Sequence, residues 1–171
     1  NRPFPEAWLR AGLDERNWTH RNTCPAIGIL PLSGTEWSMY VSEHYGWSDN
    51  RLRRLSVRPW GFASIGAGHK GGTVDTCAMR FVAPQLRLNF STSAVGSVRV
   101  EIGDEEGRAL PGFALDDMDP LYGDQLDEPI SWKGGGDLSA LIRTPVRLRF
   151  ELRDADVFSL RFADPDEGGQ S

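Results

Sequence analysis

The feature that most constrains the fold of this chain is a strict alternation of apolar and polar residues between Leu86 and Gly107. Every second residue is apolar from 86 to 90, and the alternation returns from 98 to 102 after the turn-like segment STSAVG. A period of two places successive side chains on opposite faces of a strand, so each segment is predicted to be a half-buried β-strand. Two such strands joined by a short turn predict an antiparallel hairpin, which needs further strands to cover its apolar face.

A second stretch near the C-terminus repeats this pattern. Apolar residues alternate with charged or polar ones over 146–152 and 158–162, and 154–156 is predicted to be the turn between them. Two hairpins, each with one apolar and one polar face, favour two antiparallel sheets packed face to face. No helical pattern long enough for parallel crossover connections interrupts them. The predicted class is therefore all-β, an antiparallel two-sheet β-sandwich of jelly-roll type.

The first third of the chain predicts a β-meander packed on the sandwich. A meander of this size resembles one propeller blade, which cannot bury both of its faces alone. The segment RPWG at 58–61 is the predicted boundary, so the meander would span 1–59, the sandwich 60–163 and a disordered tail 164–171. The three strand candidates of the meander are 26–30, 36–41 and 51–57.

Charge and apolar content exclude several classes of partner. The formal charge is -5 at pH 7, whereas nucleic acid and anionic membranes are bound through clustered Lys and Arg. No apolar run approaches the roughly 18 residues of a membrane-spanning helix. The only cysteines, Cys24 and Cys77, are expected either to form a bridge or to be two buried thiols. We therefore expect neither nucleic acid nor a membrane as partner.

Four segments carry a resemblance to a known family. They are RLRRLSVRPWGFASIGAGHKGGTVDT, LRLNFSTSAVGSVRVEIGDEEGRALPGF, SWKGGGDLSAL and PVRLRFELRDADVFSLRF. Together they resemble the C-terminal region of bacterial glycoside-hydrolase-like proteins. These are similar to the clan of the family 32 and family 43 enzymes, in which a five-bladed β-propeller precedes a β-sandwich. The resemblance covers roughly residues 20–163.

The resemblance implies a place in a larger protein and the lack of an activity. Residues 60–163 would be the sandwich, and residues 20–58 would be the last blade and connector of a propeller that is otherwise absent. In that clan the catalytic carboxylates come from several propeller blades, so no catalytic residue is assigned here. The chain is expected to be a fragment of a secreted or periplasmic parent protein.

Aromatic residues beside polar ones are the candidates for a sugar site. A flat ring packs against the C–H face of a sugar, while neighbouring polar groups bind its hydroxyls. Trp132 in a Gly-rich loop and Tyr122 in an acidic loop are the first candidates, and Trp47 and Tyr45 at the tip of the N-terminal hairpin come next. The alternative for Trp132 is a position at the end of the core.

The acidic loop is also a candidate for a structural Ca²⁺ ion, with Asp116, Asp117 and Asp124 as ligands. Carboxylate oxygens from a loop suit this hard cation. The alternative is a merely solvated acidic loop, and no cofactor is required by any other pattern.

The leading hypothesis is a non-catalytic carbohydrate-binding or accessory module of a glycan-degrading protein. Its partners would be a polysaccharide or oligosaccharide and a catalytic propeller domain. One alternative is a purely structural module that packs on the propeller through an apolar patch around Trp37, Met39 and Val57.

The other alternative is a small glycoside hydrolase in its own right. Such enzymes need two carboxylates that flank the scissile bond. The nearest arrangement is Glu101, Asp104 and Glu105, but Gly103 stands where a further acid would be required. The sequence therefore favours a binding role over catalysis.

Overall fold

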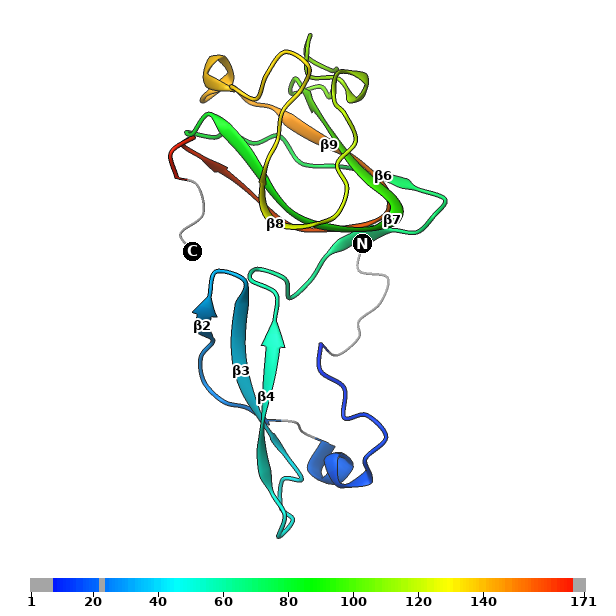
Figure 1. The fold of residues 1–171 in the computed structure, drawn as a ribbon, viewed down its shortest axis with the longest axis vertical. Coiled ribbons are helices and arrows are strands. Elements are labelled where there is room, and N and C mark those ends of the chain that lie inside the picture. The colour runs from blue at the N-terminus through cyan, green and yellow to red at the C-terminus, as the bar shows by residue number, and fades with distance from the viewer. Residues whose placement is uncertain (1–7, 22–23, 168–171) are drawn as a thin grey trace. The chain divides into compact units, whose positions relative to one another are not determined.

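The fold is described from a computed structural model, over residues 8–21 and 24–167 (Figure 1). The prediction of an all-β chain with two antiparallel sheets, consistent with a β-sandwich, is confirmed. The chain divides into two compact units, one ending at Phe62 and the other beginning at Ala63. Of the predicted disordered tail, residues 168–171 lie outside the described residues.

The first unit is built on a four-stranded antiparallel sheet. Its strand β3 (Glu36–Glu43) pairs with each of the other three strands, and the pairing with β4 runs without a break from Trp37 opposite Val57 to Glu43 opposite Arg51. The predicted strands 36–41 and 51–57 are therefore confirmed. The other elements of this unit are η1 (Glu15–Arg21), β1 (Cys24–Pro25), β2 (Leu30–Ser33) and β4 (Arg51–Val57).

The predicted strand 26–30 is wrong. The chain is extended only at β1 and again from Leu30, and Gly28 between them has a φ of 97°. Glycine adopts this left-handed region at little steric cost, so the backbone turns out of the sheet at this point. Residues 26–29 therefore form a connection between two short strands, and Leu30 begins the second of them.

The second unit is dominated by two long strands, β7 (Gln85–Gly103) and β9 (Arg147–Ala163). They pair with each other in antiparallel register from Gln85 opposite Ala163 to Gly103 opposite Arg147, and Figure 1 shows them curving side by side. The two predicted hairpins are therefore wrong, because each supposed hairpin is one continuous strand. The segments read as turns are bends within the strands.

The bends coincide with a break in register. Thr92 lies opposite Ala155, and the next pair is Ser97 opposite Arg153, so β7 contains extra residues that bulge out of the ladder. A bulge bends its strand and increases the local twist. A second, smaller shift lies between Asn89 opposite Ser159 and Phe90 opposite Val157, and the ladder from Ser97 to Gly103 is regular. One pair of strands therefore covers both ends of the same core.

Shorter strands extend this sheet on both sides. The strands β5 and β6 pair with β9, and β8 pairs with β7. No helix among the described residues is long and apolar enough to cross a membrane. The remaining elements are β5 (Ile65–Ala67), β6 (Gly72–Asp75), η2 (Leu115–Asp117), β8 (Asp124–Pro129) and η3 (Ser139–Leu141).

One hydrophobic core fills the second unit. The inward residues of both ends of β7 and β9 belong to the same cluster, as the alternation in the sequence predicts. Residues from the long loops complete the cluster, among them Met118, Ile130 and Leu138. The fully buried residues of these two strands are Leu86, Leu88, Phe90, Val98, Val100, Ile102 and Leu148.

Neither expectation for the cysteines holds. Cys24 and Cys77 are both free, and both are exposed rather than buried. Cys24 lies in β1, and Cys77 lies after β6 in the other unit.

Candidate functional site

Trp132, a predicted sugar-binding residue, lies in the core. Its side chain is 4% exposed, and its indole Nε1–H donates a hydrogen bond of 2.9 Å to the carbonyl oxygen of Val100. Its ring packs edge-on against Phe113 with 5.2 Å between the centroids. A ring held in this way cannot present its face to a sugar, so the core alternative is the correct one. Tyr122 lies in the same unit and is 59% exposed.

The three predicted calcium ligands do not form a metal site. One carboxylate oxygen of Asp117 accepts a hydrogen bond from the backbone N–H of Ala114, and Asp124 lies in β8 opposite Ser91. The backbone carbonyl of Asp116 accepts a hydrogen bond from the Lys133 ammonium group. Across the described part of the chain, no three His, Cys, Asp or Glu side chains gather closely enough to hold a metal ion.

The other two aromatic candidates, Tyr45 and Trp47, lie together on the loop between β3 and β4. Their side chains are 49% and 48% exposed. The loop contains two successive turns, in which the N–H of Trp47 bonds the carbonyl of His44 and the N–H of Asn50 bonds the carbonyl of Trp47. The guanidinium of Arg16 lies 5.7 Å from the centre of the Trp47 ring, a cation–π distance.

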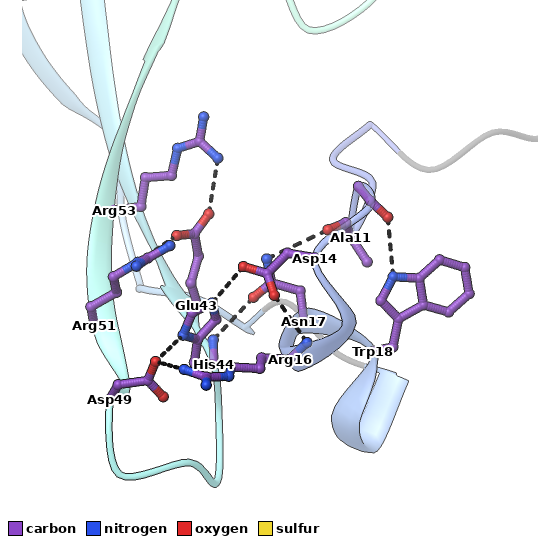
Figure 2. Close-up of polar contacts among 11 residues, drawn as sticks. Ala11, Asp14, Arg16, Asn17, Trp18, Glu43, His44, Asp49, Arg51 and Arg53 are labelled. Carbon is purple, nitrogen blue, oxygen red and sulfur yellow. Dashed lines mark hydrogen bonds and ion pairs between the residues drawn. The ribbon is translucent and has the colours of Figure 1, made fainter.

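A buried histidine holds this loop to the N-terminal segment (Figure 2). The Nδ1 atom of His44 lies 2.9 Å from a carboxylate oxygen of Asp49, and Nε2 lies 2.8 Å from one of Asp14. The backbone N–H of His44 donates to the side-chain oxygen of Asn17 at 3.0 Å. The side chains of Asp14 and Asn17 belong to the segment before the sheet, so His44 joins two parts of the chain 27 to 30 residues apart.

The two carboxylates favour the charged form of the histidine. Hydrogen bonds to Asp14 and then to Asp49 raise the pKa of His44, although partial desolvation opposes them. The hydrogen bond from His44 lowers the pKa of Asp14. Desolvation is the largest single effect on Asp49 and raises its pKa. The hydrogen bonds from His44 and Arg16 act against it, and the pKa of Asp49 is lowered overall. Because both ring nitrogens are occupied, His44 holds the loop in place and has no nitrogen available as a general base.

An open groove of about 620 Å³ lies between this N-terminal segment and β4. Arg51 and Arg53 project from alternate positions of β4, and each donates a 2.9 Å hydrogen bond to the carboxylate of Glu43 on the neighbouring strand. These bonds, first of all the one from Arg53, lower the pKa of the buried Glu43. The polar residues that line the groove are Asp14, Asn17, Glu43, Arg51, Arg53 and Arg54.

The groove and the aromatic loop share their supporting residues. Asp14 and Asn17 line the groove and also hold His44, which begins the loop of Tyr45 and Trp47. The site therefore combines two half-exposed rings with guanidinium, carboxylate and amide groups on one unit. The sequence pointed to the two rings but missed the groove, because nothing in the spacing connects Asp14 or Asn17 with a histidine 27 or more residues later.

Comparisons with known protein families, with characterised proteins and with solved structures find no match to this chain.

Proposed function

We propose that this chain is a non-catalytic carbohydrate-binding module, and that its ligand lies on Tyr45 and Trp47 and extends into the neighbouring groove. The observation that carries the proposal is the pair of half-exposed rings on a loop that His44 fastens to the groove wall. Aromatic rings offer flat apolar area to a sugar, and the charged and amide groups of the groove offer hydrogen bonds to hydroxyls. A fixed loop also lowers the entropy lost on binding.

The lowered pKa values of the groove carboxylates favour binding over catalysis. A glycosidase needs a general acid with a raised pKa opposite a second carboxylate. In the groove the pKa values of both Asp14 and Glu43 are lowered by their partners. In the other unit, Glu101 is buried and accepts a hydrogen bond from the backbone of Leu115, and Asp104 accepts hydrogen bonds from Arg108 within a turn.

The resemblance to the C-terminal region of glycoside-hydrolase-like proteins supports the same proposal. An accessory module would hold a glycan near the catalytic domain of a secreted or periplasmic parent protein. In that setting the two partners are the polysaccharide and the catalytic propeller.

The test is binding of the purified chain to a panel of plant and microbial polysaccharides by affinity gel electrophoresis and calorimetry, with reducing-sugar release measured on the same samples. We expect retardation by at least one polysaccharide without release of reducing ends. Retardation should be lost in the variant Trp47→Ala and kept in Tyr122→Ala. A chain that binds no polysaccharide would contradict the proposal, and sugar release would contradict its non-catalytic part.

A second candidate function is the purely structural module. The apolar patch first expected for it is not exposed, since Val57 is buried and Trp37 and Met39 are half-buried. The opposite face of the first sheet supports it instead. Leu30 and Leu52 lie opposite Ser38 and Ser42, share that face with Tyr40, and all three large side chains are exposed.

Sheet packing through this face predicts a measurable self-association. The variant carrying Leu30→Ser and Leu52→Ser should then be more monomeric than the wild-type chain in analytical ultracentrifugation. An unchanged sedimentation profile would remove the support for this second function.

A further inference from the structure

The arginines of the groove point to the chemical class of the ligand. Three guanidinium groups line the groove, from Arg51, Arg53 and Arg54, against the two carboxylates of Asp14 and Glu43. Both carboxylates are already engaged, since Glu43 accepts from two arginines and Asp14 pairs with His44. Arg54 pairs with Glu36 at 2.9 Å, but Arg51 and Arg53 share the single carboxylate of Glu43. This pair of arginines therefore carries one positive charge in excess, although the whole chain carries a formal charge of -5.

Arg51 and Arg53 form a preorganised pair. They are two residues apart on β4, which places both side chains on one face about 7 Å apart along the strand. Glu43 fixes both of them through one N–H of each guanidinium, Nε of Arg51 and Nη1 of Arg53. The side chains are still 57% and 59% exposed, so the outer part of each guanidinium faces solvent.

Guanidinium groups in this state suit a carboxylate ligand. Each carries five N–H donors in a planar fork, and a carboxylate binds such a fork through two parallel hydrogen bonds. The shared salt bridge to Glu43 has already restricted the rotamers, so less entropy is lost when a ligand binds. A neutral sugar would use the same donors less strongly, because its hydroxyls carry no charge.

We propose that the ligand is an acidic glycan, with uronic-acid carboxylates bound by Arg51 and Arg53 while neighbouring sugar rings lie on Tyr45 and Trp47. This inference rests on the proposed function, since it names the class of glycan for the same site. It predicts that charge on the polymer, and not only its sugar sequence, decides the affinity.

The test compares polygalacturonate with the same polymer after methyl esterification, which removes the carboxylate charge and keeps the backbone. We expect the wild-type chain to bind polygalacturonate more tightly in affinity gels. This difference should fade from about 0.01 M to about 1 M salt, over which the Debye length falls from about 30 Å to 3 Å. In Arg51→Gln with Arg53→Gln, affinity for polygalacturonate should fall about tenfold or more, as expected for lost charge-assisted hydrogen bonds.

Two further variants keep the result interpretable. Arg99→Gln, on the second unit, removes an arginine paired with Glu151 at 3.7 Å and should leave binding unchanged. Glu43→Gln removes the carboxylate that holds both arginines and should weaken binding of polygalacturonate less than the double arginine variant does, because both guanidinium groups remain. If Glu43→Gln abolishes binding while the double arginine variant keeps it, the proposal is wrong.

The outcomes separate this inference from the function on which it rests. Equal binding of the acidic and esterified polymers, lost in Trp47→Ala but kept in the double arginine variant, would overturn the acidic-glycan inference and leave the carbohydrate module intact. Absence of binding to either polymer, or to any polysaccharide of the wider panel, would overturn both.

Discussion

Gly96 of β7 lies so close to Asp154 of β9 that a Cβ at position 96 would be 2.2 Å from the carbonyl oxygen of Asp154. The same Cβ would be 2.8 Å from the carbonyl oxygen of Arg153. Both residues lie where the two long strands bend, and Asp154 itself has a φ of 44°. The bend in one strand is therefore shaped by the backbone of the other, and only glycine fits at the crossing.

Replacement of Gly96 by alanine should destabilise the second unit. The added methyl group meets backbone rather than a flexible side chain, so strands β7 and β9 must separate at the bulge. We expect a loss of about 1–3 kcal/mol in the free energy of unfolding, measured by urea denaturation. Gly134→Ala is the matched control, since no atom lies within 4 Å of a Cβ there. Equal stabilities of the two variants would show that the strands have room for a methyl group at the crossing.

Trp132→Ala should damage stability rather than binding. The substitution removes a buried ring, its hydrogen bond to Val100 and its edge-on contact with Phe113. Truncation of a large buried aromatic side chain costs about 3–5 kcal/mol. The exposed Tyr122→Ala, on the same unit, should stay within about 0.5 kcal/mol of the wild type. A Trp132→Ala protein of normal stability that no longer binds sugar would restore Trp132 to the site.

The attachment of the N-terminal segment should depend on pH. The raised pKa of His44 contributes stability that is complete below its ordinary value of 6.5 and is lost as the pH rises through the higher value in the folded protein. The lowered pKa values of Asp14 and Asp49 contribute stability that is complete above pH 3.8, the ordinary pKa of an aspartate. This stability is lost as the pH falls through the lower pKa values that the two groups have in the folded protein. Amide hydrogen exchange of residues 11–18 should therefore be slowest between about pH 4 and 6.5 and speed up on both sides of this range, after correction for intrinsic rates. A protection profile without a decrease above pH 6.5 would contradict a charged His44.

The variant Asp14→Asn tests which carboxylate matters most to this histidine. The hydrogen bond to Asp14 is the largest cause of the raised pKa, so NMR titration of the His44 ring should give a lower pKa in this variant than in the wild type. Asp49→Asn should lower the pKa by less. The reverse order would assign the main partnership to Asp49.

The alternation of apolar and polar residues identified the inward side chains of β7 and β9 correctly, but it could not identify their partners. A hairpin and a single bent strand give the same alternation, since both keep successive side chains on opposite faces. The segment STSAVG has the composition of a turn, and its role as a bulge depends on β9, which is about 60 residues away in the sequence. Local patterns carry no information about such a distant partner.

The candidate site shows the same limit. Trp132 and Trp47 are both tryptophans in polar loops. They are distinguished by the ring contact of Trp132 with Phe113 and by its hydrogen bond to the carbonyl of Val100. Tyr45 and Trp47 lie at the tip of the predicted hairpin, where exposed side chains are expected. The bridge from Asp14 through His44 to Asp49 joins residues that no sequence motif connects, so it became visible only in the folded chain.

The carbohydrate site can be located by an NMR titration of the isotope-labelled whole chain with oligogalacturonate and with neutral oligosaccharides from the polysaccharide that it binds best. We predict that the largest shift changes fall on the Trp47 indole N–H, on the amides of residues 44–50 and on the arginine side chains of β4. Resonances of Tyr122 and Trp132 should stay in place. Saturable changes confined to the second unit, or no change with any glycan, would contradict a carbohydrate-binding site on the loop of Tyr45 and Trp47.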